Sequence, residues 1–371
     1  MSILTLLANI LMVGHSLVGP DLPGMTEAAI AAVGAPAAVE AQVINGASLR
    51  WNWDHAAEAE GVNARALLAT GNTDVLVLTE AQPLASHLEW SDSRGAVADW
   101  ARAAWAGNPV AQVFLYETWP SLNLAPGGGP AWRAQIASDL PGWQSLVAAA
   151  SAARPEGAPQ ARLIPAGQAM GLLADALARG DIPGAVDIAD FFHDDIHLSG
   201  RGHYFVALVQ MAAITGQSPE GLPPRLTRVW RDRASIVSPE MAAALQSIAG
   251  QAVATQRAAE DAAPPPPPPQ PSTAAMPVVV LPGITNPDLA LGLAGIADWS
   301  VQQPFLDVMK TARPWIAHKP GEWGGWDYAQ LQAAGHVDAR GWPQSLPEGA
   351  TGMSTLVLTD LPPEAGGLAG R

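Results

Sequence analysis

The chain has 371 residues, of which 49% are hydrophobic and 14% charged, so it can bury a sizeable core and is long enough for two domains. Its formal net charge of −15 argues against nucleic acids and anionic membrane surfaces as partners. The absence of cysteine excludes disulfides, thiolate metal sites and cysteine nucleophiles.

Residues 1–13 are apolar, as in a signal peptide, but no lysine or arginine occurs before Arg50. A signal peptide needs a positively charged start, and this run is too short and too interrupted to span a membrane. We therefore interpret it as the first strand with its lead-in. The compartment stays open between the cytoplasm and export by a non-classical route.

The segment 10–17, Ile-Leu-Met-Val-Gly-His-Ser-Leu, has the pattern of a buried parallel strand that ends at a glycine. Ligands of open α/β sheets bind at the carboxyl ends of the strands. Ser16, which follows soon after that glycine, is therefore a candidate nucleophile. The alternative is a loop serine that only caps the next helix.

Apolar runs then alternate with helical patterns. Strands are predicted at residues 39–44, 74–80, 111–116 and 161–164. Helices are predicted at residues 25–33, 96–106, 132–153 with a break near Pro141, 168–179 and 202–215. This alternation predicts a parallel, doubly wound sheet of five strands between helices, a three-layer α/β/α fold.

Aromatic residues follow two of the predicted strands. Trp51 and Trp53 lie in a predicted loop after the second strand, and Tyr116 and Trp119 lie at the end of the fourth. Such rings stack on sugars and also pack in cores. We expect these four residues to contribute to substrate binding, with core packing as the alternative.

A second motif places Asp194 three residues before His197, ahead of the last predicted helix of the domain. A histidine oriented by a carboxylate is the usual activator of a serine hydroxyl. We therefore expect His197 to be the base and Asp194 its partner, with Asp195 as the second choice. Two alternatives remain: an aspartate that only caps the helix, or a metal site formed by His193, Asp195, His197 and His203.

Together, Gly14-His15-Ser16-Leu17 and Asp194-x-x-His197-Leu198-Ser199 resemble the SGNH (GDSL-type) hydrolases, over roughly residues 8–215. The resemblance implies an α/β/α esterase domain in which Ser16, His197 and Asp194 form a catalytic triad. It also implies that the backbone N–H groups of Ser16 and Gly46 stabilise the oxyanion of the acyl-transfer intermediate. The alternative for Asn45-Gly46 is a tight turn, and the two roles are compatible.

The chain departs from the family at the third strand, where Gly-x-Asn-Asp is replaced by Thr79-Glu80-Ala81-Gln82. The family's asparagine supplies a third oxyanion donor. Gln82 offers an amide at nearly the same place, whereas Glu80 donates only when it is protonated. We therefore assign Gln82 to the oxyanion hole. The departure is also compatible with a binding protein on an enzyme's fold.

Beyond residue 215 the composition of the sequence changes. We predict a helical extension over 216–261 that packs on the domain or forms a stalk, then a Pro-rich linker over 262–275. Six consecutive prolines in this linker make a polyproline II rod of about 20 Å. Residues 276–371 are Trp-rich and predict a small β-rich, carbohydrate-binding module, with strands at 278–281 and 354–358. It is short of strands for a closed sandwich, so it is either truncated or completed by another chain.

These observations predict a serine esterase that removes O-acyl groups, acetyl groups in particular, from a carbohydrate or polysaccharide, without cofactor or metal. The alternative is a catalytically weak or inactive carbohydrate-binding or assembly protein on the same fold. The expected partner is accordingly an acylated carbohydrate or another glycan, and neither nucleic acid nor a membrane span is expected.

Overall fold

The computed structural model describes residues 8–124, 129–226, 237–262, 313–316 and 356–359. The chain divides into two compact units, Met1–Gln270 and Pro271–Arg371. In the second unit, strands β7 (Arg313–Ile316) and β8 (Leu356–Thr359) pair antiparallel. β8 overlaps the strand predicted at 354–358.

Several predictions for the second half of the chain fall outside the described residues. These are the linker from residue 263 onward, the strand at 278–281 and most of the Trp-rich module predicted over 276–371.

The first unit is built on a six-stranded sheet in the order β3-β2-β1-β4-β5-β6. Its strands are β1 (Ala8–Gly14), β2 (Ala37–Val43), β3 (Glu60–Gly61), β4 (Val75–Leu78), β5 (Gln112–Tyr116) and β6 (Arg162–Ile164). All neighbouring pairs are parallel except β2 and β3, which pair antiparallel. The five predicted parallel strands are confirmed. β3 is a sixth strand, too short to give a sequence pattern.

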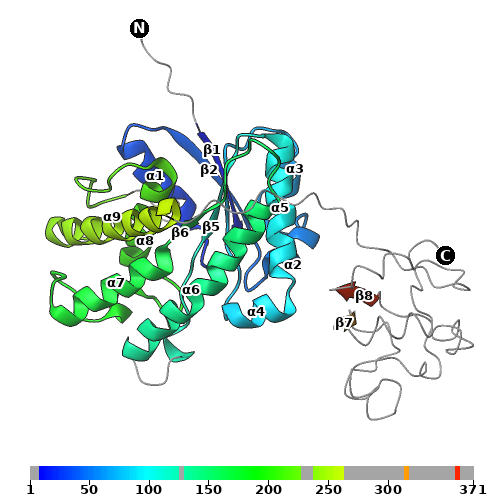
Figure 1. The fold of residues 1–371 in the computed structure, drawn as a ribbon. Coiled ribbons are helices and arrows are strands. Elements are labelled where there is room, and N and C mark those ends of the chain that lie inside the picture. Colours follow the sequence, from blue (N-terminus) through cyan, green and yellow to red (C-terminus); the bar gives the residue numbers. More distant parts are fainter. Residues whose placement is uncertain (1–7, 125–128, 227–236, 263–312, 317–355, 360–371) are drawn as a thin grey trace, which may run out of the picture. The chain divides into compact units, whose positions relative to one another are not determined.

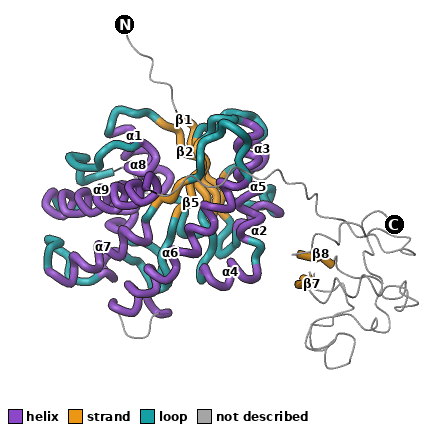
Figure 2. The backbone as a smooth tube through the Cα atoms, in the orientation of Figure 1, coloured by secondary structure: helices purple, strands orange, loops and turns teal. Residues whose placement is uncertain are grey.

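Helices cover both faces of this sheet (Figure 1). They are α1 (Asp21–Ala32), α2 (Leu49–Asp54), α3 (Ala64–Leu68), α4 (Leu84–Trp90), α5 (Ser93–Gly107), α6 (Gly129–Ala152), α7 (Ala166–Arg179), α8 (Gly200–Thr215) and α9 (Pro239–Ala262). α1, α7, α8 and α9 lie on one side, and α2, α3 and α5 lie on the other (Figure 1). Figure 2 shows the strands at the centre of this arrangement, which confirms the predicted three-layer fold.

The core has two apolar clusters, one on each face of the sheet. Along β1, Ile10 and Met12 belong to one cluster, while Leu11 and Val13 belong to the other. Successive side chains of a strand point to opposite faces, so a central strand is apolar throughout. β1 is therefore buried on both faces, and the turn after it is held firmly in place.

Two predicted elements differ from the structure. α6 is continuous through Pro141 instead of breaking there. A proline inside a helix removes a hydrogen bond, but Trp132 and Trp143, on either side of it, are fully buried and hold the helix in place. The helical extension is not a stalk, because α9 buries Met241 and Leu245 in the cluster shared with α1 and α8. Among the described helices, none is long and apolar enough to cross a membrane.

Candidate active site

Ser16 lies in the turn that follows β1, at the carboxyl edge of the sheet. β2 lies on one side of β1 and β4 on the other, so this turn occupies the topological switch point, where α/β folds bind ligands. Gly14, at the end of β1, packs closely on the end of β4: a Cβ there would lie 2.4 Å from Thr79 Cγ2. The glycine is therefore needed to bring the Ser16 turn this close to its neighbour.

His15 anchors the same turn from inside. It is buried, its Nε2 lies 3.0 Å from the carbonyl oxygen of Glu80, and its Nδ1 accepts the backbone N–H of Leu17 at 3.4 Å. Burial lowers the pKa of His15 to about 4, so the ring is neutral at physiological pH. These two contacts require the tautomer with hydrogen on Nε2, which donates to Glu80. His15 therefore holds the Ser16 turn against the end of β4.

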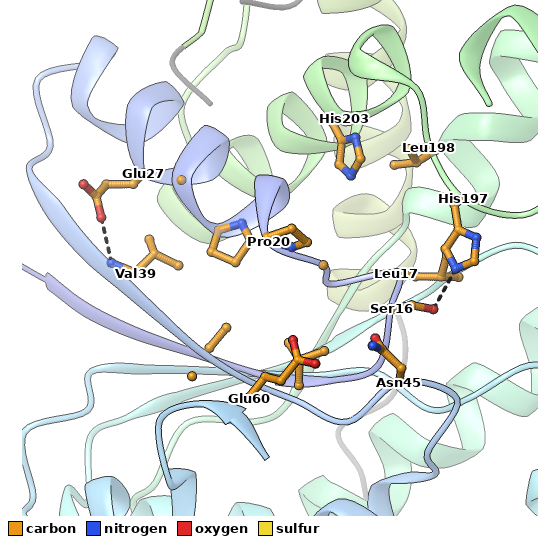
Figure 3. Close-up of a pocket in the computed structure, with 16 residues that line it drawn as sticks. Ser16, Leu17, Pro20, Glu27, Val39, Asn45, Glu60, His197, Leu198 and His203 are labelled. Atoms are coloured by element: carbon orange, nitrogen blue, oxygen red, sulfur yellow. Dashed lines mark hydrogen bonds between the residues drawn. The ribbon is translucent and has the colours of Figure 1, made fainter. Parts of the chain in front are cut away.

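The imidazole of His197 lies between the Ser16 hydroxyl and the Asp194 carboxylate. Its Nε2 is 2.9 Å from Ser16 Oγ, as Figure 3 shows, and its Nδ1 is 2.8 Å from Asp194 Oδ2. The fold thus joins two motifs 181 positions apart in the chain. In such a hydrogen-bonded chain, the ring can take the hydroxyl proton while the carboxylate fixes its orientation.

Asp194 is fixed by the backbone as well as by the ring. Its Oδ1 accepts the N–H groups of Ile196 at 2.9 Å and of His197 at 2.7 Å. Desolvation raises the pKa of Asp194, but these bonds and the imidazole outweigh it and bring the pKa down to about 2. Asp195, the second choice, does not reach the ring, because its carboxylate bonds to the Ser121 hydroxyl.

The loop that carries His197 is held by the segment that follows β5. The indole N–H of Trp119 donates to the carbonyl of Ile196 at 2.9 Å, and the N–H of Leu122 donates to the carbonyl of Asp195 at 2.7 Å. Tyr116 donates its hydroxyl to the carbonyl of Leu17 at 3.4 Å. Tyr116 and Trp119 are fully buried. The prediction that they bind substrate is therefore wrong: both rings turn inward and support the site from behind.

Trp51 and Trp53 lie on α2 instead of a loop, and neither lines the cavity beside Ser16. Trp53 packs edge-on against Trp100, with ring centroids 4.8 Å apart, and the guanidinium of Arg65 covers it. Trp51 is exposed and stacks on His55 at 3.8 Å. Trp53 thus packs as the alternative had it, whereas substrate contact by the exposed Trp51 stays a prediction.

The amide of Gln82 is not part of this site either. Its Nε2 donates to Thr118 Oγ1 at 3.1 Å, and its Oε1 accepts the N–H of Leu84 at 3.0 Å. Gln82 does not line the cavity that holds Ser16. Its assignment to the oxyanion hole is wrong, because the amide joins the turn after β4 to the segment after β5.

Glu80 instead links the turns after β2 and β4. It is fully buried, and its Oε1 accepts the N–H groups of Leu49 at 3.1 Å and of Ala81 at 2.8 Å. Desolvation raises the pKa of this carboxyl. The turn that Glu80 helps to hold contains Gly46, whose φ of 71° suits a tight turn closed by the bond from Ala47 N–H to the carbonyl of Ile44.

Asn45 is a site residue that the sequence analysis missed. It lines the cavity together with Ser16 and His197, and its amide is directed toward Ser16 (Figure 3). Within the described part of the chain, no hydrogen bond holds this amide elsewhere. The sequence signal that could have revealed it is a side-chain amide just after β2, the strand that pairs with β1.

A cavity of about 580 Å³ opens at Ser16 and runs between α1 and β2. This volume lies within the range of small-molecule pockets. The residues predicted as an alternative metal site do not converge, and among the described residues no group of histidine, aspartate and glutamate could hold a metal ion.

The fold has counterparts among solved structures. A DUF4886 family protein from Bacteroides uniformis has 15% identity, over 67% of this chain and 95% of its own, with a TM-score of 0.44. A GDSL-like lipase from Parabacteroides merdae has 13% identity, over 57% of this chain and 96% of its own, with a TM-score of 0.40. A carbohydrate esterase family 3 protein from Talaromyces cellulolyticus has 12% identity, over 57% of this chain and 97% of its own, with a TM-score of 0.37.

These likenesses concern the fold alone. The resemblance to the SGNH hydrolases rests on the two motifs of the sequence. Neither protein-family models nor curated proteins gave a match. At such low identities, these structures assign no activity to this chain.

Proposed function

We propose that the chain is a serine ester hydrolase with Ser16 as nucleophile, His197 as general base and acid, and Asp194 as the residue that orients His197. One observation carries this proposal: a hydrogen-bonded chain runs from Ser16 Oγ through His197 to Asp194, and Ser16 and His197 line a cavity.

In the first half of the reaction, Ser16 Oγ attacks the ester carbonyl carbon while His197 Nε2 accepts the hydroxyl proton. The tetrahedral intermediate collapses, the bond to the alcohol oxygen breaks, and Nε2 gives the proton to that oxygen. Asp194 stays ionised, since its pKa is about 2, and stabilises the imidazolium.

In the second half, water attacks the acyl group on Ser16 and loses a proton to His197 Nε2. The bond to Ser16 Oγ breaks, the acid leaves, and the proton returns to the serine. No cofactor is needed to balance either half.

We assign the oxyanion to three donors: the N–H groups of Ser16 and Gly46 and the side-chain amide of Asn45. Ser16 and Gly46 follow from the family pattern, and Asn45 takes the part first assigned to Gln82. Its support is its position on the cavity wall beside the nucleophile (Figure 3). Such donors act because they are already aimed at the charge that develops during attack.

For the alcohol part of the ester we propose a carbohydrate. The support is the openness of the site on the side of His197: the side chains of His197 and Asp194 are 42% and 44% exposed. A bulky, polar alcohol can reach the serine from that side without burial.

Hydrolysis of p-nitrophenyl acetate by wild type and Ser16→Ala tests the proposal. We expect the substitution to lower kcat by about 10³-fold or more. Ser86→Ala, at an exposed position on α4, is the matched control and should leave the rate unchanged. Equal rates for wild type and Ser16→Ala would contradict the proposal.

The second candidate, a glycan-binding protein without activity, is favoured by one observation: Gln82 of the variant third motif does not line the Ser16 cavity. Binding on a glycan array that survives Ser16→Ala, with no hydrolysis of any acylated glycan, would support it.

A further inference from the structure

The cavity beside Ser16 is much longer than the reacting atoms need. On one wall, Pro20, Pro23 and Glu27 follow helical spacing along one face of α1. On the other, Val39, Ala41 and Val43 alternate along one face of β2. Two regular elements therefore build the walls, which gives the cavity a defined shape.

The cavity leads away from His197. In Figure 3, His197 lies on one side of Ser16, while Pro20, Val39 and Glu27 lie progressively farther away on the other side. The alcohol oxygen must lie near His197 Nε2, because it takes its proton from that atom. The acyl part of the ester then points the opposite way, into the cavity.

The walls are mainly apolar beyond Ser16. Leu17 and Val43 are buried, and Pro23, Val39 and Ala41 continue the apolar surface. An acetyl group would leave most of a cavity of about 580 Å³ without contact. Apolar walls of this kind favour an acyl chain that removes its methylene groups from water.

Two carboxylates stand farther along the cavity, and no lysine or arginine is among the described residues that line it. Glu27 lies at the far end in Figure 3 and accepts the N–H of Val39 at 3.0 Å, while Glu60 is exposed on β3. A negative charge at the end of the acyl chain would meet like charges here.

From these features we infer that the cavity is the acyl site and that it selects neutral acyl groups of several carbons over acetyl and over acyl groups with an anionic end. This inference rests on the proposed hydrolase function and departs from the acetyl group predicted from the sequence. Val39 and Ala41 set the length of chain accepted, and Glu27 and Glu60 set its charge.

Chain length is tested with p-nitrophenyl acetate, butanoate and hexanoate on the full chain. We expect kcat/KM to rise by up to about fourfold for each methylene added. Val39→Trp should lower the ratio of hexanoate to acetate hydrolysis by about tenfold or more relative to wild type. Val186→Trp, at a position 86% exposed outside the cavity, is the matched control.

Ala41→Phe fills the same cavity from a neighbouring position and keeps the test valid should Val39→Trp unfold the protein. Circular dichroism shows whether each variant is folded. A flat or falling chain-length profile in wild type, or equal loss on acetate and hexanoate in both filled variants in their folded form, would overturn the inference.

Charge is tested with the mono-p-nitrophenyl ester of adipic acid, whose acyl chain matches hexanoate but ends in a carboxylate. Wild type should hydrolyse it at least about tenfold more slowly than hexanoate, because like charges repel. Glu60→Gln and Glu27→Gln should reduce the difference in rate between the hexanoate ester and the adipate monoester. The glutamine at position 27 still offers an oxygen to the N–H of Val39. An unchanged gap in both variants would overturn the charge selection.

Failure of the acyl-site inference and failure of the proposed hydrolase function give different results. If acetate is hydrolysed in a Ser16-dependent way but longer chains are not preferred, only the acyl site is wrong. If no ester is hydrolysed in a Ser16-dependent way, the proposed function falls and the acyl site with it.

Discussion

At the scale of single residues, Asn45 provides the sharpest test of the oxyanion assignment. Asn45→Ala should lower kcat by about 10²- to 10³-fold with little change in KM, because the donor acts mainly in the transition state. Steady-state kinetics with a p-nitrophenyl ester measures both constants. Asn72→Ala, on an exposed turn, is the control and should behave like wild type.

Gln82→Ala completes this comparison. We expect it to affect stability more than kcat, because its amide bonds to Thr118 and Leu84 and not to the site. The assignment would be contradicted if Gln82→Ala lost kcat at constant KM while Asn45→Ala kept it.

Asp194 is a second residue whose role can be separated from its structural contacts. In Asp194→Asn, one side-chain oxygen can still accept the N–H groups of Ile196 and His197, but the charged partner of His197 Nδ1 is lost. We expect kcat to fall by about 10³- to 10⁴-fold. Asp195→Asn, whose side chain meets Ser121, should cost far less, and similar losses in both variants would argue against the assignment.

At the same scale, the sequence pointed to Ser16, His197 and Asp194 as candidates because each lies in a short motif beside an element, and the fold brings the three side chains together. It could not place Trp119. The indole is buried because the loop of residues 194–197 folds over it and accepts its N–H. That contact joins segments 77 positions apart, and no local pattern encodes it.

At the scale of elements, Glu117 couples the end of β5 to the start of α7. It is fully buried, accepts the backbone N–H of Gln168 at 3.0 Å, and also accepts its side-chain amide at 2.8 Å. Desolvation raises the pKa of Glu117 from 4.5 to about 7, and the bonds from Gln168 reduce this effect only in part. The folded protein therefore holds a proton here that the unfolded chain has released.

This proton makes stability depend on pH. Between pH 4.5 and pH 7 the folded state binds more protons at Glu117 than the unfolded state, so stability falls as pH rises. Since each unit of pKa difference corresponds to about 1.4 kcal/mol, the loss is about 3 kcal/mol, and it is complete above pH 7. Glu117→Gln removes this dependence.

Urea denaturation of wild type and Glu117→Gln at pH 5 and pH 8 measures the effect. His15 acts in the opposite direction: its pKa of about 4 means that stability is lost as pH falls below 6.5. The difference between wild type and variant at each pH cancels that contribution. The free energy of unfolding of the variant minus that of wild type should be about 3 kcal/mol larger at pH 8 than at pH 5. A constant difference would contradict the assignment.

The elements themselves were predictable where they are long and strongly patterned. β1 and β4 are continuous apolar runs because both of their faces are buried. α2 was not predicted, since Leu49–Asp54 is short and its two tryptophans suggested a binding loop. Ser48, which caps α2 through the N–H of Trp51 at 3.2 Å, was the overlooked signal.

At the scale of the whole molecule, α9 completes the apolar core of the first unit. A chain ending after residue 262 should therefore keep its cooperative unfolding and its activity on p-nitrophenyl esters. A chain ending after residue 215 would expose the core side chains that Met241, Leu245 and Val253 cover. This loss should cost at least about 5 kcal/mol, which is comparable to the stability of a whole domain.

Thermal unfolding followed by circular dichroism distinguishes the two truncated chains. We expect a cooperative transition for the longer one and none, or one at much lower temperature, for the shorter. Equal transitions in both would mean that α9 is dispensable. The sequence showed that this segment is helical, but its amphipathic face alone did not reveal which surface it covers.

The central claim is that Ser16 is a nucleophile activated by His197. The most direct test is labelling of the full chain with a fluorophosphonate, followed by peptide mass spectrometry and measurement of the labelling rate. We predict one adduct, on the peptide that contains Ser16, formed much more slowly in His197→Ala. An adduct on another residue, or labelling of Ser16 at the same rate in His197→Ala, would contradict the account.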